Sequence, residues 1–288
     1  MPEKRRVKGS EKAMRAAAAK KSRPSRPQLF IGTAGWTVPR EHQRSFAREG
    51  KTPSSASGLE RYASALRCAE INTTFYRRHK PGTFERWRDS VPEDFEFAVK
   101  MPGAITHETN LSSPRAALDE FLGDVRHLGK KLGPILVQLP PSAVFDARRC
   151  GTFFRILRDL HAGPIACEPR HESWYEERVS ELFARHDIAR VVADPARPHG
   201  ASEPAGSKAL VYLRLHGSPR RYWSPYDHRR LEEWAESIAR APKRSVVWCV
   251  FDNTASGAAA GDALKLLKIM KRRSRGKGRA LREGKKLP

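Results

Sequence analysis

The sequence contains little cysteine. Its four cysteines, Cys68, Cys150, Cys167 and Cys249, are scattered without the CxxC spacing of a zinc or redox site. Three of them fall in apolar, strand-like runs, where cysteine usually packs as a small hydrophobic residue. We therefore expect neither a disulfide framework nor a structural zinc.

Long apolar runs are also missing. No stretch approaches the ~20 consecutive apolar residues that a membrane-spanning helix needs. The N-terminal segment is rich in Lys, Arg, Ala and Pro and lacks the apolar core of a secretory signal. We therefore expect a cytoplasmic protein with no membrane partner.

The glycine motifs that bind nucleotides do not appear. The turn after the first strand-like run reads Gly32-Thr33-Ala34-Gly35-Trp36, which lacks the GxGxxG pattern and is not followed directly by a helix. No Walker-type loop occurs elsewhere. These absences argue against a Rossmann dinucleotide domain and a P-loop enzyme, and we expect no cofactor.

What the sequence has in excess is positive charge, and most of it lies at the two ends. The net charge is +23; residues 1–27 and 271–288 each carry +8, which leaves +7 for residues 28–270. This division predicts a barrel domain over 28–270 between two flexible basic tails. Polycationic tails bind phosphate backbones without reading sequence, although they also occur as plain solvated termini.

Eight short apolar runs recur along the central segment, and helical stretches separate most of them. Alternating strands and helices predict parallel pairing with right-handed crossovers, and eight such units favour closure into a barrel. The predicted fold is a single (β/α)8 TIM-type barrel of the α/β class, irregular around its sixth unit because the Pro- and Gly-rich residues 194–209 show no helical pattern. The predicted strands are Leu29–Trp36, Cys68–Phe75, Phe95–Met101, Ile135–Leu139, Ile165–Arg170, Ala189–Asp194, Leu210–His216 and Val246–Asn253.

Two of the helices have sequence patterns at their N-termini. Ser113-Pro114 is typical of an N-cap followed by proline at the first helical position. Ser173 and Glu176 have the spacing of a capping box ahead of a helix through Val179 and Phe183. The last helix is predicted over residues 258–270.

Nearly every apolar run ends on a polar residue. Because side chains alternate between the faces of a strand, these residues are predicted to face the lumen near the C-terminal strand ends, where barrels of this type carry their active sites. Catalytic roles are assigned to Glu70, Lys100, His107, Glu168, His171 and His216. Glu70 or Glu168 is expected to act as general acid/base and one of the histidines to shuttle a proton, while Lys100, like Arg170 and Arg214, is expected to hold negative charge. Ligand binding is assigned to Trp36, Asn72, Tyr76, Gln138, Arg170, Trp174, Asp194, Tyr212, Arg214 and Asn253.

Other interpretations of these charges remain open. The same acids and bases could form a buried lattice of ion pairs that fixes the strand register. A divalent metal could bind Glu70, Glu168, Asp194 and a histidine, although the interleaved Lys and Arg would compete for the carboxylates. The loops 217–221 and 253–257 have the small residues of a phosphate site, but Gly and Ser are also ordinary turn formers.

Several motifs in order resemble the YecE-like family, domain of unknown function 72. They are Glu70 to Tyr76, Lys100 with Ile105-Thr106-His107, Ile135 to Pro141, Glu168 to Trp174, Tyr212 to Gly217 and Phe251 to Thr254. The resemblance runs from about Phe30 to Leu267 and implies a triosephosphate-isomerase-type barrel, with a kinship to sugar isomerases at fold level only. Two residues depart from the family pattern: Pro169 lies inside the Glu-x-Arg-His motif, and Asp252 stands where the family tends to have a second asparagine. The basic tails look like additions to the family core.

Three functions are compatible with the sequence. The first is an enzyme of the isomerase or hydrolase kind that acts on a small polar or anionic compound, such as a sugar or phosphorylated sugar, by acid/base chemistry. The second is a nucleic-acid-binding or processing protein that uses the basic tails. The third is a barrel that serves as a scaffold without catalysis. The oligomeric state has no sequence correlate here.

Overall fold

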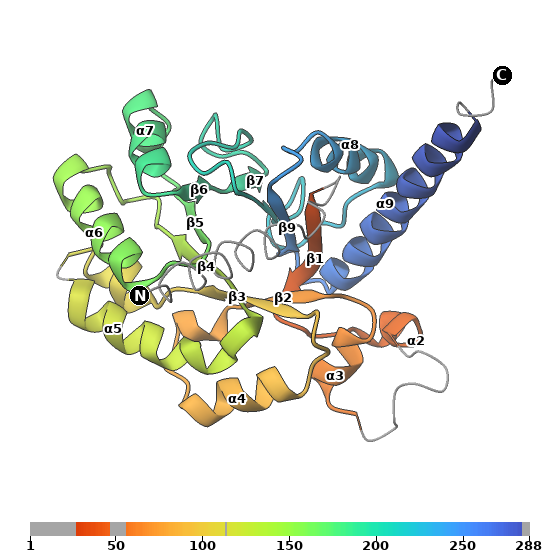
Figure 1. Cartoon of the computed structure of the whole chain (residues 1–288), viewed down its shortest axis with the longest axis horizontal. Coiled ribbons are helices and arrows are strands. Elements are labelled where there is room, and N and C mark those ends of the chain that lie inside the picture. Colours follow the sequence, from red (N-terminus) through yellow and green to blue (C-terminus); the bar gives the residue numbers. More distant parts are fainter. Residues whose placement is uncertain (1–26, 47–55, 113, 284–288) are drawn as a thin grey trace, which may run out of the picture.

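Parallel strands form one curved sheet at the centre of the molecule, and helices surround it (Figure 1). The structure is a computed structural model that describes residues 27–46, 56–112 and 114–283. Its strands lie in the order β6-β5-β4-β3-β2-β1-β9-β8-β7. They are β1 (Gln28–Ala34), β2 (Cys68–Ile71), β3 (Glu96–Lys100), β4 (Leu132–Gln138), β5 (Ile165–Glu168), β6 (Ile188–Arg190), β7 (Val192–Asp194), β8 (Leu210–Leu215) and β9 (Val246–Phe251). The predicted TIM-type barrel is confirmed.

The sixth predicted strand is divided into two. Strands β6 and β7 are joined by Val191; β6 pairs with β5, whereas β7 pairs with β8. One stretch of chain therefore bonds to both ends of the sheet and brings the barrel to closure. No helix occurs between Asp194 and Ala209, as predicted. This segment returns to β6 through a bridge between Gly206 and Ala189, flanked by hydrogen bonds from the Arg190 N–H to the Ala205 carbonyl and from the Ser207 N–H to the Ile188 carbonyl.

The helices lie on the outside of the strands (Figure 1). The α-helices are α2 (Gln43–Phe46), α3 (Gly58–Ala63), α4 (Pro81–Asp89), α5 (Pro114–Val125), α6 (Ala147–Leu160), α7 (Glu177–Arg185), α8 (His228–Ala239) and α9 (Ala258–Glu283). Shorter turns are η1 (Arg40–His42), η2 (Thr73–Phe75), η4 (Arg126–Lys131) and η5 (Glu172–Trp174), and η3 (Ala104–Glu108) is a π-helical turn.

Helix α6 illustrates why these segments fold as they do. Asp146 caps its N-terminus by accepting a hydrogen bond from the Arg149 backbone N–H at 2.7 Å. Phe153, Phe154 and Leu157 recur at helical spacing and are fully buried. The apolar stripe thus packs toward the strands while the polar face meets solvent.

The predictions about helix N-termini and about the two tails have different outcomes. The predicted capping box at Ser173 is wrong, because Ser173 lies in η5 and the N-cap of α7 is Glu176, which makes no side-chain cap. Ser113 lies outside the described residues, as does the predicted tail 1–27 except for its last residue. The predicted C-terminal tail is, up to Glu283, the continuation of α9.

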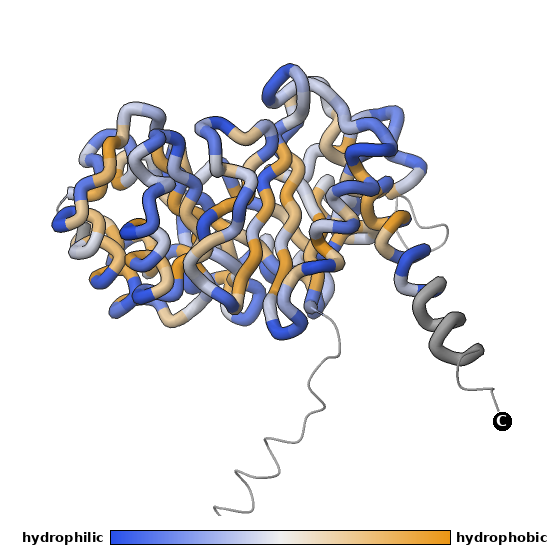
Figure 2. Tube along the Cα trace, turned by 90° about the horizontal axis from the view of Figure 1, so that it is seen from above, coloured by the Kyte–Doolittle hydropathy of each residue, from blue (hydrophilic) through white to orange (hydrophobic). Residues whose placement is uncertain are grey.

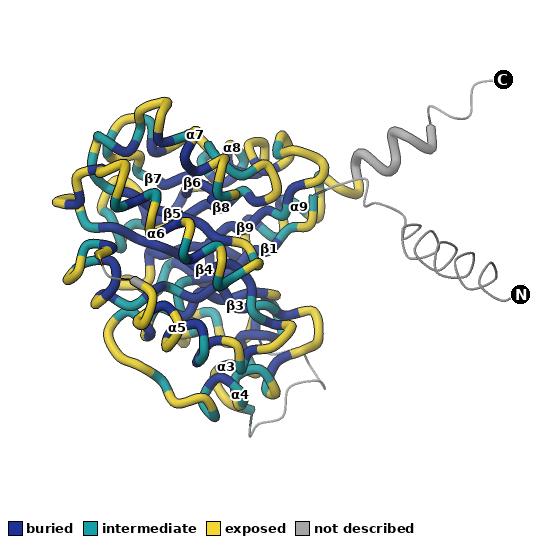
Figure 3. Tube along the Cα trace, turned by 60° about the vertical axis from the view of Figure 1, so that its left-hand side comes forward, coloured by how far each residue is buried: buried dark blue, intermediate teal, exposed yellow. Residues whose placement is uncertain are grey.

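The strands are among the most hydrophobic and most buried parts of the chain (Figures 2 and 3), and the buried residues form two clusters. The larger cluster fills the space between strands and helices, and the smaller one fills the barrel lumen. In the lumen, Trp248 is 1% exposed and stacks on Phe30 and Tyr212, with ring centroids 4.8 and 6.1 Å apart. Its ring leaves no room for a side chain at Gly133, where a Cβ would lie 2.6 Å from it.

The same apolar surroundings hold all four cysteines. Each is buried and free, with Cys68, Cys167 and Cys249 in strands and Cys150 in α6. Burial raises the pKa of the Cys68 and Cys167 thiols well above the usual range.

Among the described residues, no helix combines the length and the apolar character that crossing a bilayer would demand.

Candidate active site

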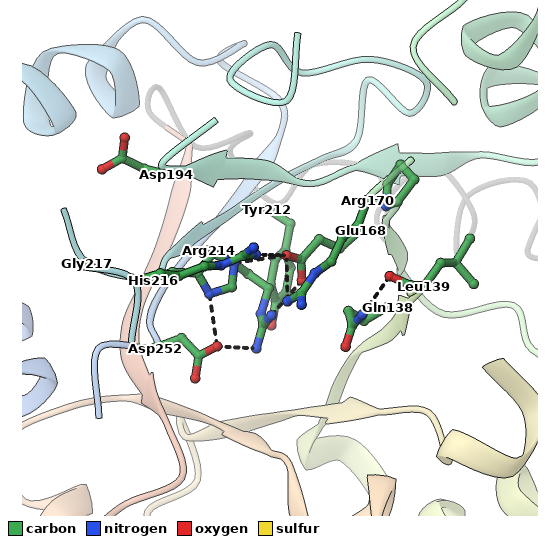
Figure 4. Close-up of polar contacts among 12 residues, drawn as sticks. Gln138, Leu139, Glu168, Arg170, Asp194, Tyr212, Arg214, His216, Gly217 and Asp252 are labelled. Carbon is green, nitrogen blue, oxygen red and sulfur yellow. Dashed lines mark hydrogen bonds and ion pairs between the residues drawn. The ribbon is translucent and has the colours of Figure 1, made fainter. Parts of the chain in front are cut away.

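Arg214 is the centre of a polar network at the C-terminal end of the lumen (Figure 4). Its side chain, on β8, is 2% exposed. It donates from Nε and Nη2 to the two oxygens of Glu70, at 3.1 and 2.6 Å. Nη1 donates to Glu168 at 2.5 Å, and Nη2 also donates to Asp252 at 3.1 Å. One guanidinium therefore joins carboxylates from β2, β5 and the end of β9.

Three groups of the network, Arg214, Glu168 and Asp252, are held in their ionised forms. Burial opposes the charge of Arg214, but Glu70, Glu168 and Asp252 together raise its pKa well above the ordinary value. Burial likewise opposes ionisation of Glu168, but Arg214 and then His216 hold the pKa of this carboxyl well below its usual range. The pKa of Asp252 is lowered for the same reason. These groups form fixed charges rather than groups that titrate near neutral pH.

His216 lies between two of these carboxylates. Its Nδ1 is 3.0 Å from Asp252 Oδ2, and its Nε2 is 2.9 Å from Glu168 Oε1. A neutral imidazole donates through only one nitrogen, so both contacts are hydrogen bonds to ionised oxygens only when the ring is protonated. The ring thus bridges the Glu168 and Asp252 carboxylates.

Tyr212 joins the network through Glu70, whereas Asn72 makes no hydrogen bond to it among the described residues. The Tyr212 hydroxyl donates to Glu70 Oε2 at 2.8 Å, so both Glu70 oxygens are occupied. Burial, followed by the Glu70 charge, raises the pKa of Tyr212 well above its ordinary value. Asn72 follows β2, and its Oδ1 is buried without a hydrogen-bond partner among the described residues.

Lys100 differs from the other cations of the site. It ends β3, and its Nζ lies over the Phe75 ring, 3.9 Å from the centroid. Burial, assisted by the charge of Arg214, lowers its pKa to about 8. Lys100 makes no ion pair within 4.0 Å among the described residues. With a pKa of about 8, Lys100 can exchange a proton near neutral pH.

His107 lies next to Lys100 on the turn η3. Its ring packs edge-on against Phe75, with centroids 4.8 Å apart, and its Nδ1 is 2.8 Å from the Thr106 hydroxyl. Burial and the charges of Lys100 and Arg170 lower its pKa. His107 is consequently neutral at neutral pH and can both donate and accept a hydrogen bond.

Two further arginines approach the network. Arg170 Nη2 is 3.3 Å and Arg221 Nη2 is 3.6 Å from the same Glu168 oxygen that faces His216. Their side chains are 16% and 28% exposed. The Tyr222 ring lies 5.2 Å from the Arg221 guanidinium and meets the His216 ring edge-on, with centroids 5.3 Å apart. Nitrogens of Arg170, Arg221 and His216 thus surround one oxygen of Glu168.

Asp194 does not join the network, because the predicted inward parity of the sixth strand is wrong. Val192 belongs to the outer core layer and Val191 to the lumen, so Asp194 points outward toward α8 (Figure 4). There its Oδ1 pairs with Arg230 at 2.6 Å. A helix can satisfy a polar residue at a strand end as well as the lumen can.

Asn253 and Gln138 also bond away from the centre. Asn253 donates to the Ser224 carbonyl at 3.0 Å and to Asp262 of α9 at 2.9 Å, so it ties the β8–α8 loop to the last helix. Gln138 donates to the carbonyl of Leu139 at 2.7 Å (Figure 4). Neither side chain bonds to the Arg214 network.

The predicted aromatic residues are dispersed. Trp36 packs against Trp87 at 5.2 Å, and Tyr76 is 81% exposed. Trp174 is 1% exposed and donates from Nε1 to the Ala143 carbonyl at 2.7 Å. These contacts give Trp36 and Trp174 packing partners in the core.

His171 lies on the loop after β5 but outside the network. Its Nδ1 is 2.9 Å from the Ser173 hydroxyl, and the same nitrogen accepts from the Ser173 backbone at the start of η5. The ring therefore orders its own turn.

Sequence analysis did not assign Asp252 or Tyr222 to the site, and it included Arg221 only as part of the candidate phosphate loop 217–221. Asp252 was recognisable, since the lumen alternation of Trp248 and Val250 on β9 continues to this residue. Arg221 and Tyr222 lie on an irregular loop, where no periodicity indicates direction. Tyr222 has a φ of 64°, a value that side-chain-bearing residues rarely adopt.

The carboxylate oxygens of the site are occupied by donors of the protein itself rather than left open for a metal ion. Both oxygens of Glu70 and of Glu168 already accept from Arg214, Tyr212 or His216. Within 27–46, 56–112 and 114–283, no three His, Cys, Asp or Glu side chains are grouped as a metal site requires.

A family model described as a protein of unknown function, DUF72, matches residues 30–285. The chain belongs to this family. Its relatives in the DUF72 group include the UPF0759 protein YecE of Escherichia coli K12, which is 30% identical over 182 residues, or 61% of this chain and 62% of YecE. The UPF0759 protein YunF of Bacillus subtilis is 25% identical over 276 residues, or 84% of this chain and 94% of YunF. The alignment with YecE thus spans less than two thirds of that protein.

Crystal structures of DUF72 proteins share the barrel. One from Thermotoga maritima has 25% identity and a TM-score of 0.67 over 85% of this chain and 99% of its own. One from Enterococcus faecalis has 22% identity and a TM-score of 0.69 over 85% and 96%. The DUF72 description states no activity, so the function must be inferred from the site.

Proposed function

We propose that this DUF72 protein is an enzyme that converts a small polar, anionic compound, of the sugar or phosphorylated-sugar kind, by proton transfer at the C-terminal mouth of the barrel. The observation that carries the proposal is Lys100, a half-buried amine beside a network of fixed charges, with a pKa lowered to about 8. A general acid/base works best with a pKa near the operating pH, and Lys100 meets that requirement.

In this proposal the buried Arg214 holds the carboxylates in place, whereas the less buried Lys100 and His107 act on the substrate. All three nitrogens of Arg214 are already engaged with carboxylates, so Arg214 acts as a positioning residue that keeps Glu70 and Glu168 in place. Lys100 accepts or donates the proton. His107, which is neutral and adjacent, is suited to hydrogen-bond an oxygen of the substrate.

Arg170 and Arg221 supply the affinity for negative charge. Each has one nitrogen near Glu168 and further N–H groups at a partly exposed position. Planar guanidinium groups bind carboxylates and phosphates through paired hydrogen bonds. The Gly217-to-Arg221 loop, which sequence analysis marked as a phosphate site, contributes through the Arg221 side chain in this view.

The charge balance favours an enzyme over a purely structural lattice. The three carboxylates Glu70, Glu168 and Asp252 are matched by the guanidinium groups of Arg214, Arg170 and Arg221, each of which lies within 4.0 Å of at least one of them. Lys100 is then a cation beyond what the lattice needs, and a half-buried lysine costs folding free energy. Retaining such a group is expected of a residue that acts on a ligand.

Hydrogen–deuterium exchange tests for proton transfer before the substrate has been identified. The full-length protein is incubated in D₂O with a panel of sugars, sugar phosphates and hydroxy or keto acids, and loss of C–H signals is followed by ¹H NMR between pH 6 and pH 9. We expect exchange in one anionic class, its abolition in Lys100→Met and a raised KM in Arg221→Met. Equal exchange by wild type and Lys100→Met, or none by wild type across the panel, would overturn the proposal.

A further inference from the structure

Helix α9 has two opposite faces. Ala263, Leu266 and Ile269 recur at helical spacing and are buried against the barrel, where α9 contacts β1, β9 and α8. Residues on the other face are exposed. The helix runs along the edge of the molecule, and its C-terminal part extends away from the strands (Figure 1).

The exposed face carries a row of cations that we call the α9 stripe. It consists of Lys265, Lys268, Lys271, Arg272 and Arg275, all of which are exposed. At 100° per residue these positions fall within about a third of the helix circumference, and at 1.5 Å per residue they extend over about 15 Å. The stripe is thus a straight line of positive charge.

Most of this charge is not neutralised by the protein. Lys265 pairs with Asp262 at 3.2 Å, and Arg272 lies 3.6 Å from Glu232. Among the described residues, Lys268, Lys271 and Arg275 make no ion pair. The five cations of the stripe line a surface hollow of about 440 Å³ together with His228 and Ile269. Within the described part of the chain, no acidic residue lines this hollow.

We propose that the α9 stripe binds the phosphodiester backbone of nucleic acid without reading its sequence. Phosphates along one strand of a duplex follow each other every 3.4 Å or so of axis, so ~15 Å of stripe faces about four or five of them. Side chains of lysine and arginine, long and flexible, reach successive phosphates from one helix face. This function is separate from the chemistry proposed at the barrel mouth.

A lipid surface fits the stripe less well. Helices that lie on membranes combine a basic face with large apolar side chains that insert into the bilayer. Here the apolar face of α9 is buried against the barrel, and the large exposed hydrophobic residues, Tyr76, Val144 and Trp223, lie on other elements. Only the charge is available, which matches a polyanion in solution.

The test compares two triple variants of the full chain with equal charge. Lys268→Glu/Lys271→Glu/Arg275→Glu changes the stripe, whereas Arg148→Glu/Lys208→Glu/Lys243→Glu changes exposed cations on other elements. Each lowers the net charge of +23 by six. Binding to a labelled random-sequence duplex of about 20 base pairs is measured by fluorescence anisotropy between about 50 and 200 mM salt.

For the wild type we expect affinity to fall steeply with salt. The stripe variant should bind at least tenfold more weakly, with the log–log salt slope reduced by about 2.7, since each lost phosphate contact removes about 0.9. The charge-matched control should keep most of the affinity and slope. Because the cations of residues 1–27 and of residues 276–288 remain in both variants, the difference reports the stripe alone.

Two outcomes would overturn the proposal. Equal loss in both triple variants would assign binding to net charge, and stripe-dependent binding to anionic vesicles that exceeds binding to the duplex would assign the stripe to membranes. If the glutamate variant were to unfold, Lys268→Gln/Lys271→Gln/Arg275→Gln provides the same comparison without added acids, and circular dichroism verifies its fold.

Discussion

Replacing Arg214 with methionine removes the cation that three buried carboxylates share. Glu70 loses two hydrogen bonds, Glu168 and Asp252 lose one each, and all three remain buried. Removing one partner of a buried ion pair typically costs about 3–5 kcal/mol because an uncompensated charge is left behind. For a domain of this size that corresponds to a fall in Tm of roughly 6–20 °C.

The measurement is urea unfolding at pH 7 with Arg148→Met as control. Arg148 is exposed at the start of α6, and its replacement should change stability by less than about 0.5 kcal/mol. Adding Glu70→Gln to Arg214→Met removes one of the stranded charges and should restore part of the loss. A cost below about 1 kcal/mol for Arg214→Met would refute the description of a tightly coupled buried network.

The pH dependence gives a second check on the same reasoning. The folded-state pKa values of Glu168 and Asp252 lie below their unfolded values, so their contribution is present above about pH 4 and is lost as the pH falls through the folded pKa. Without Arg214 this contribution disappears. The stability gap between wild type and Arg214→Met should therefore narrow as the pH falls below about 4.

Three further perturbations follow from the geometry. Lys100→Met should raise the free energy of unfolding at pH 7 by on the order of 1 kcal/mol. Because the folded-state pKa of Lys100, about 8, lies below its unfolded value, this gain in stability should shrink as the pH rises from 8 toward about 10.4. A gain that does not change with pH in urea titrations would contradict this reasoning. Trp248→Ala should cost about 3–5 kcal/mol in the same assay, against little for the exposed Trp223→Ala, and similar losses in both would disprove the filled lumen. Gly133→Ala should cost about 1–3 kcal/mol through overpacking against Trp248, and calorimetry should show partial recovery when Trp248→Phe is added; additive losses would count against that contact.

Alternation of apolar and polar residues was sufficient to predict most of the barrel. On β8, where Val211, Leu213 and Leu215 are apolar and the intervening residues polar, parity gave the correct face for Tyr212 and Arg214. The prediction succeeded where a strand was long and had one polar face. The resemblance to the family agreed with this fold but supplied no roles for residues.

The sixth strand shows where the same reasoning fails. Its residues Ala189, Val191 and Ala193 offer a small apolar face, and Asp194 seemed to mark the lumen. The structure instead gives Asp194 a partner on α8, which no local pattern encodes. For a related reason the sequence placed Arg221 on a candidate phosphate loop without giving its direction, and it did not indicate Tyr222, since the direction of both side chains depends on contacts made across the fold.

The division of the sixth strand has a consequence for solubility. Were Ile188 to Asp194 displaced, β5 and β8 would each present a row of unpaired N–H and C=O groups, and such exposed edges template association between chains. Because the segment from Ile188 to Asp194 pairs with both β5 and β8, neither strand presents an exposed edge. Resistance to edge-to-edge aggregation in this protein therefore depends on a single short segment that lies next to a helix-free connection.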